Sequence, residues 1–70
     1  MGRIVASREY WEKLKEIGNE CSLLRISLGI TQEQVAKETN STAGYISLFE
    51  HGKVNSAIIL NWYIRNGYRG

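Results

Sequence analysis

Apolar residues in the first third of the chain recur at steps of three and four, a spacing typical of one face of an α-helix. The residues of this stripe are Tyr10, Leu14, Ile17, Cys21, Leu24 and Leu28. Glu and Lys side chains occupy the opposite side, which predicts a solvated face. No segment of the chain alternates apolar and polar residues over enough positions to predict a β-strand. We therefore expect an all-α fold.

Gly18 and Asn19 lie in the middle of this stripe and leave two interpretations open. One long helix would keep the stripe continuous, whereas a break would divide it into two helices. Because Gly costs about 1 kcal/mol relative to Ala inside a helix, we favour two helices or one bent helix. Ser7 is the expected cap at the start of the segment.

Three shorter helices are expected after Gly29, a residue that favours a helix end. The first begins with a capping box from Thr31 to Gln34 and ends near Thr39, before a turn at Asn40-Ser41. Thr42 is the expected cap of the next helix, which ends at Gly52. The last runs over residues 57–65, begins at Asn55 or Ser56 and is closed by Asn66-Gly67.

Composition restricts the chemistry that this chain can perform. With 70 residues, one Cys, one His and no Asp, it has no side-chain set for a disulfide framework, a cysteine zinc cluster or a catalytic triad. We expect a single domain over 1–70, with a helical extension over 1–20 and a core over 21–66. We expect no enzyme activity, no cofactor and no metal. We find no segment that resembles a signal peptide and no apolar run of about 18 residues. We therefore expect no membrane location.

Two short helices joined by Asn40-Ser41 form a helix-turn-helix pattern. Residues 23–53 resemble the phage repressor and Cro-like (XRE or Cro/C1-type) helix-turn-helix DNA-binding family. The matching positions are Arg25, Gly29, Ile30, Thr31, Gln32, Val35, Ala36, Ile46, Ser47, Glu50, Gly52 and Lys53. The resemblance implies a compact lambda-repressor-like domain of four to five helices, with double-stranded DNA as its partner.

The resemblance also implies roles for individual residues. Arg25 and Glu50 correspond to a structural ion pair between the first helix and the end of the third, and Gln32 to a contact with a phosphate. The start of the third helix enters the major groove in this family. The positions that read base edges in this family correspond to Thr42, Ala43, Gly44, Ser47 and Leu48. The implied DNA-binding residues are Gln32, Thr42, Ala43, Gly44, Tyr45, Ser47 and Lys53. The turn departs from the family pattern, with Asn40 where Gly is frequent and Ser41 where a small apolar residue is usual.

The implied recognition helix is sparse, because it has no Arg, Lys, Asn or Gln for bidentate contacts with base edges. Residues 1–20 carry four basic and four acidic residues, and residues 21–70 carry five and three, so the whole net charge of +2 lies beyond residue 20. The basic candidates for phosphate contacts are Lys37, Lys53, Arg65 and Arg69. Either a dimer doubles these contacts or DNA is not the main partner.

The last helix is apolar on nearly all of its sides. So small a domain cannot cover all of this apolar surface. Two alternatives carry equal weight: the N-terminal helix packs over it, or a second copy does. The candidate dimer interface consists of Tyr10, Trp11, Ile59, Trp62 and Tyr63. Cys21 is expected to be a buried core residue. His51, near the end of the third helix, is interpreted as a surface or capping residue.

These features predict a sequence-specific DNA-binding transcriptional regulator, a phage or bacterial repressor that binds as a homodimer and occludes a promoter. The predicted location is the bacterial cytoplasm, on the nucleoid, or the host cytoplasm for a phage-encoded protein. The alternative is a protein-binding module on the same fold, an antirepressor or an adaptor that docks on another regulator.

Overall fold

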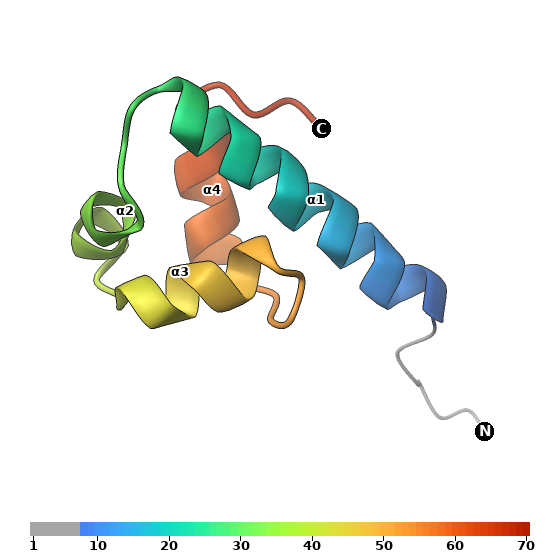
Figure 1. The fold of residues 1–70 in the computed structure, drawn as a ribbon. Coiled ribbons are helices and arrows are strands. Elements are labelled where there is room, and N and C mark those ends of the chain that lie inside the picture. The colour runs from blue at the N-terminus through green and yellow to red at the C-terminus, as the bar shows by residue number, and fades with distance from the viewer. Residues whose placement is uncertain (1–7) are drawn as a thin grey trace.

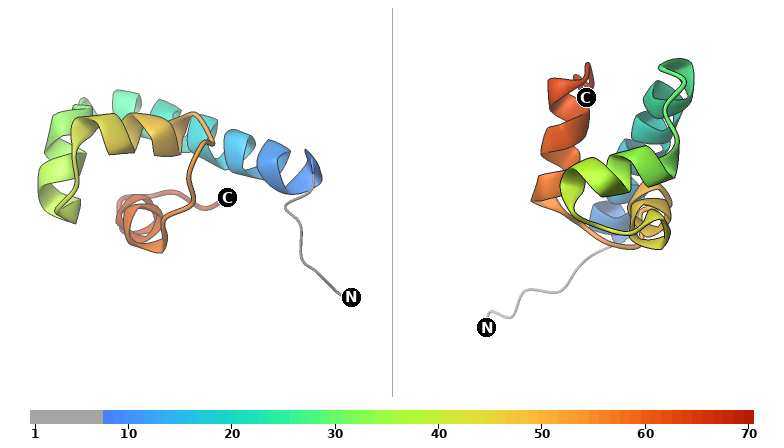
Figure 2. Two further views of the ribbon diagram at one scale, coloured as in Figure 1. Left: turned by 90° about the horizontal axis from the view of Figure 1, so that it is seen from below. Right: turned by 90° about the vertical axis from the view of Figure 1, so that its left-hand side faces the viewer.

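Four α-helices make up the part of the chain that the computed structural model describes, residues 8–70. They are α1 (Arg8–Ser27), α2 (Gln32–Thr39), α3 (Ala43–Glu50) and α4 (Ala57–Arg65). The long α1 lies across one side, α2 and α3 meet at a tight turn, and α4 lies behind them (Figure 1). The first turns of α1 project beyond the other helices (Figure 2). Residues 8–70 contain no strand, which confirms the all-α prediction.

The three short helices begin where the sequence predicts. Thr31 and Gln34 form the capping box: Thr31 Oγ1 accepts from the Gln34 N–H at 3.1 Å, and Gln34 Oε1 accepts from the Thr31 N–H at 2.9 Å. The side chains of Thr42 and Ser56 cap α3 and α4 by accepting from the N–H groups of Tyr45 and Ile59. The expected cap at Ser7 lies outside the described residues. Local polar chemistry therefore sets the start of α2, α3 and α4.

The turn between α2 and α3 depends on one left-handed residue. Asn40 has φ 58° and ψ 45°, and its N–H bonds back to the end of α2. Asn adopts this conformation at lower cost than most residues with a Cβ. The predicted turn is confirmed, and it directs the chain from α2 into α3.

Of the interpretations left open at Gly18, two separate helices are wrong, because α1 continues through Gly18 as a single helix. A Cβ at Gly18 would lie 2.5 Å from the Phe49 carbonyl oxygen and 2.6 Å from that of Glu50. Gly52 makes the reciprocal approach, since a Cβ there would lie 2.5 Å from the Cα of Lys15. Gly18 is thus required for close packing of α1 against the end of α3. The expected boundary between residues 20 and 21 falls inside this helix.

All four helices contribute to one core. Its buried members are Cys21, Val35, Ala36, Ile46, Phe49, Ile59, Trp62 and Tyr63. Phe49 and Tyr63 stack with ring centroids 6.0 Å apart. Cys21 is fully buried, as expected, and this burial raises the pKa of its thiol to about 12.

The predicted dimer interface is wrong at three of its residues. Ile59, Trp62 and Tyr63 are 1%, 3% and 0% exposed within a single chain, so no second copy can reach them without unfolding the core. The indole Nε1 of Trp62 also donates to Glu38 Oε1 at 2.7 Å and joins α4 to α2.

The other two residues of that set, Tyr10 and Trp11, remain exposed near the start of α1. Their rings pack edge to face, and the Tyr10 hydroxyl accepts from Asn55 Nδ2 at 3.1 Å. On α4, the exposed apolar residues are Ile58 and Ile64. Any apolar contact with a partner would therefore involve these residues rather than the buried aromatic ones.

Candidate nucleic-acid interface

The two sides of α3 have opposite surroundings. Ile46, Phe49 and Glu50 are buried against the other helices. Gly44, Tyr45 and Leu48 are exposed on the outward side. The helix is therefore held from within, while its outward side is available to a partner.

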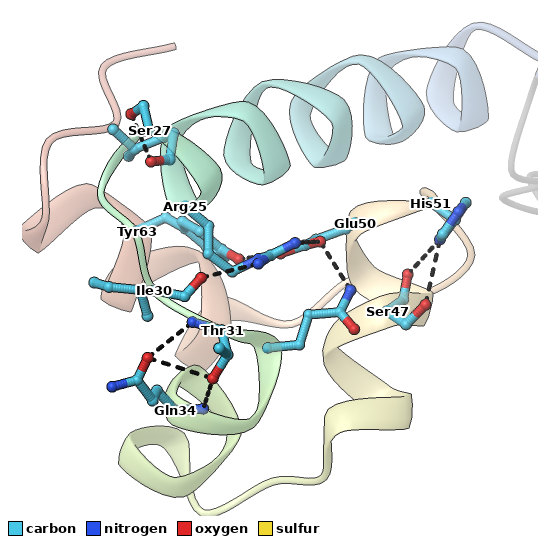
Figure 3. A network of polar contacts seen from close by, with 11 residues as sticks. Arg25, Ser27, Ile30, Thr31, Gln34, Ser47, Glu50, His51 and Tyr63 are labelled. Carbon is cyan, nitrogen blue, oxygen red and sulfur yellow. Dashed lines mark hydrogen bonds and ion pairs between the residues drawn. The ribbon is translucent and has the colours of Figure 1, made fainter.

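A buried carboxylate joins all four helices. Glu50 of α3 is 6% exposed and accepts from Arg25 of α1, with Nε to Oε2 at 2.8 Å and Nη2 to Oε1 at 3.2 Å. Gln32 Nε2 of α2 donates to Oε1 at 3.1 Å, and the Tyr63 hydroxyl of α4 donates to Oε2. Figure 3 shows Arg25 and Tyr63 converging on Glu50. The two residues that the resemblance pairs are thus in direct contact.

The network keeps the Arg25–Glu50 pair charged. Burial by itself would raise the pKa of Glu50, but the hydrogen bonds from Arg25, Tyr63 and Gln32 outweigh it and hold this pKa below its ordinary value. The hydrogen bond to Glu50 raises the pKa of Arg25. Arg25 Nη1 also donates to the Ile30 carbonyl oxygen at 2.9 Å and so fixes the loop before α2.

Gln32, the first residue of α2, has a partner that sequence reasoning missed. Its amide was expected to face a phosphate, whereas in the structure Nε2 donates to Glu50. The amide keeps a second hydrogen and its oxygen, so the phosphate contact stays a prediction. The partner is Glu50, eighteen residues later in the chain. The contact could have been anticipated from the sequence, because the expected Arg25–Glu50 pair places this carboxylate next to the start of α2.

The polar residues of α3 are used within the helix. Thr42 Oγ1 accepts from the Tyr45 N–H at 3.1 Å. His51 Nδ1 donates to the Ser47 carbonyl oxygen at 2.8 Å, because a carbonyl can only accept. Ser47 itself is half-buried, and its Oγ lies 3.5 Å from the same Nδ1. His51 is therefore a capping residue at the end of α3, as interpreted from the sequence.

Two further candidates differ in how much the fold depends on them. Ala43, the first residue of α3, is half-buried. A Cβ at Gly44 would meet no atom within 4 Å. Packing within the chain therefore does not require glycine at position 44, although glycine destabilises a helix interior relative to Ala.

Comparison with protein families identifies the fold around this surface. The Helix-turn-helix family model, of the Cro/C1 type, matches residues 23–58, more than half of the chain. The chain belongs to this helix-turn-helix family. The match covers all of α2 and α3 and the ends of α1 and α4 that flank them. No curated protein and no solved structure has a significant match to the chain.

Members of the helix-turn-helix family are DNA-binding transcription regulators. In this member, Lys53 is exposed just after α3 and lines a surface hollow together with Lys15 and His51. No acidic residue other than the buried Glu50 lies between Thr42 and Lys53. The outward side of α3 thus carries no negative charge that would repel a polyanion. By contrast, Glu12 and Glu16 of α1 line a second hollow with the same Lys15, His51 and Lys53.

Within residues 8–70, no group of His, Cys, Asp and Glu side chains can hold a metal ion. Over the same residues, no helix combines the length and the hydrophobicity needed to cross a bilayer.

Proposed function

We propose that this helix-turn-helix protein is a sequence-specific repressor of bacterial or phage origin that acts in the cytoplasm. It binds a palindromic operator as a homodimer and occludes the promoter. The observation that supports this proposal best is the outward side of α3, which is exposed and carries no carboxylate, while Ile46, Phe49 and Glu50 hold the helix from behind.

The proposed contacts divide into two groups. Gln32, Tyr45 and Lys53 contact the phosphate backbone and position the protein. The residues that face the bases are Thr42, Ala43, Gly44 and Ser47. Phosphate contacts dominate affinity but carry no sequence information, so the second group sets the choice of operator.

The small net charge supports the proposed dimer. A net charge of +2 supplies few phosphate contacts per chain, and two chains on one operator double them. Ile58 is 67% exposed and Ile64 51% exposed on α4, and we propose them, with Tyr10 and Trp11, as the apolar contacts between copies. Sedimentation equilibrium tests this, since a monomer mass at high concentration and on DNA would contradict it.

Mobility shift with genomic fragments of the host at low salt tests DNA binding. The logarithm of the binding constant should fall linearly with the logarithm of salt concentration. Lys53→Ala should make this slope shallower by about one. Lys13→Ala is the matched control, because Lys13 is exposed on α1 and forms an ion pair with Glu16 of the same helix at 3.8 Å. If no fragment is retarded, the proposal fails.

A second candidate function is a protein-binding module, an antirepressor or adaptor. The exposure of Ile58 and Ile64, together with the absence of bidentate side chains from α3, favours it. Ile58→Glu should then abolish binding to a stoichiometric protein partner, while Thr42→Ala leaves that binding intact. The opposite pattern, with DNA binding lost on Thr42→Ala, supports the repressor.

A further inference from the structure

The outward side of α3 presents carbon where base-reading helices usually present amides or guanidinium groups. Leu48 is 45% exposed and Tyr45 37% exposed. From Thr42 to Phe49 the sequence contains no Arg, Lys, Asn or Gln. The helix therefore lacks every side chain that makes a bidentate contact with a purine.

The polar side chains on the outward side of this helix are hydroxyls, which offer the bases single hydrogen bonds only. Thr42 Oγ1 accepts from the Tyr45 N–H, and His51 Nδ1 is held by the Ser47 carbonyl oxygen. Besides these hydroxyls, the outward side offers the bases mainly the isobutyl group of Leu48. Leu48 follows Gly44 by four residues, so both lie on one face of α3. The open space around Gly44 allows that face to come close to base edges.

Thymine is the base that offers an apolar partner, because its C5-methyl group lies in the major groove. We propose that Leu48 is a specificity-determining residue that recognises thymine methyl groups, with Gly44 permitting the close approach. The operator then contains A·T pairs at the positions facing Leu48. This inference rests on the proposed function, since it requires α3 to enter the major groove.

Modified bases test the inference on the unmodified protein. Duplexes are first selected from a random-sequence library, and the bound duplexes are then synthesised with uracil in place of thymine. Uracil lacks only the methyl group, so affinity should fall about fourfold for each contacted methyl removed. At the same positions, 5-methylcytosine should bind better than cytosine by a similar factor, because the methyl group is the feature that is read.

A matched pair of variants assigns the effect to Leu48. Leu48→Ala should weaken binding to the thymine duplex and abolish the difference between thymine and uracil. Leu23→Ala, which truncates an exposed apolar side chain on α1, should leave that difference unchanged. Both residues are exposed, so circular dichroism should show the same helix content for both variants as for the parent protein.

The outcomes separate the two proposals. Equal affinity for thymine and uracil duplexes would overturn the methyl readout while leaving DNA binding intact. A thymine preference that persists in Leu48→Ala would overturn the role of Leu48. If no duplex of the library is bound at low salt, the proposed function fails and the inference fails with it.

Discussion

Two helical glycines, Gly18 and Gly44, have opposite surroundings. A Cβ at Gly18 would collide with the backbone of α3, whereas a Cβ at Gly44 would meet open space. Gly44→Ala should raise the free energy of unfolding by about 0.5–1 kcal/mol through helix propensity. Gly18→Ala should lower it by about 1–3 kcal/mol through overpacking. Urea denaturation followed by circular dichroism measures both changes.

Gly44→Ala also separates an effect on stability from an effect on DNA binding. Gly44→Ala should weaken DNA binding although the protein becomes more stable, because the added methyl group lies between α3 and the bases. A variant that is more stable and binds DNA equally well would show that Gly44 is not at the interface.

Cys21 gives a second prediction at this scale. Its thiol is fully buried, and burial raises its pKa to about 12, so almost no reactive thiolate exists at neutral pH. Iodoacetamide should therefore leave the folded protein unmodified and alkylate it rapidly in urea, as mass spectrometry would record. Fast alkylation without denaturant would mean that the contact between α1 and the core opens readily.

Glu50 makes the stability of the four-helix fold depend on pH. Its pKa is lower in the folded protein than its ordinary value of 4.5, so the unfolded chain binds more protons as the pH falls. The stabilisation by Glu50 is complete at pH values above the ordinary pKa of the carboxyl group. It is lost as the pH falls through the pKa that Glu50 has in the folded protein. Glu50→Gln should reduce the free energy of unfolding at neutral pH by about 3–5 kcal/mol, because it leaves the half-buried Arg25 without a counter-charge.

A milder variant keeps this prediction measurable if Glu50→Gln does not fold. Tyr63→Phe removes one of the donors to Glu50 and leaves the ion pair with Arg25 in place. It should cost about 1.5–3 kcal/mol at neutral pH and reduce the acid dependence of urea denaturation. An unchanged acid dependence in both variants would contradict the role assigned to Glu50.

Elements whose ends depend on neighbouring residues were predictable from the sequence. The capping box at Thr31, the left-handed Asn40 and the Thr42 cap use atoms within four residues of one another, and all three were predicted. Gly18 was misjudged because the backbone that it contacts comes from α3, more than thirty residues away. Helix propensity is local and contains no information on such a neighbour.

The buried aromatic residues of α4 illustrate the same limit. An all-apolar helix predicts burial, but Trp62 and Tyr63 find their polar partners on Glu38 of α2 and Glu50 of α3. These contacts bring the aromatic side chains into the core, and Ile58 and Ile64 remain on the surface instead. Which face of α4 is covered therefore depends on the tertiary fold.

At the scale of the whole molecule, the two tryptophans report on different regions. Trp62 is 3% exposed in the core, and Trp11 is 43% exposed near the start of α1. Trp11→Phe should leave a single buried indole with blue-shifted fluorescence. Because one core joins all four helices, its red shift on heating should coincide with the loss of helical circular dichroism. Two separate transitions would show that the helices unfold independently.

The division of α3 into a buried side and an outward side has a consequence for how such regulators diversify. Ile46, Phe49 and Glu50 carry the structural contacts, while Gly44, Tyr45 and Leu48 are exposed. The outward positions can therefore be exchanged with little change in folding energy. A new set of side chains there would give the same scaffold a different target.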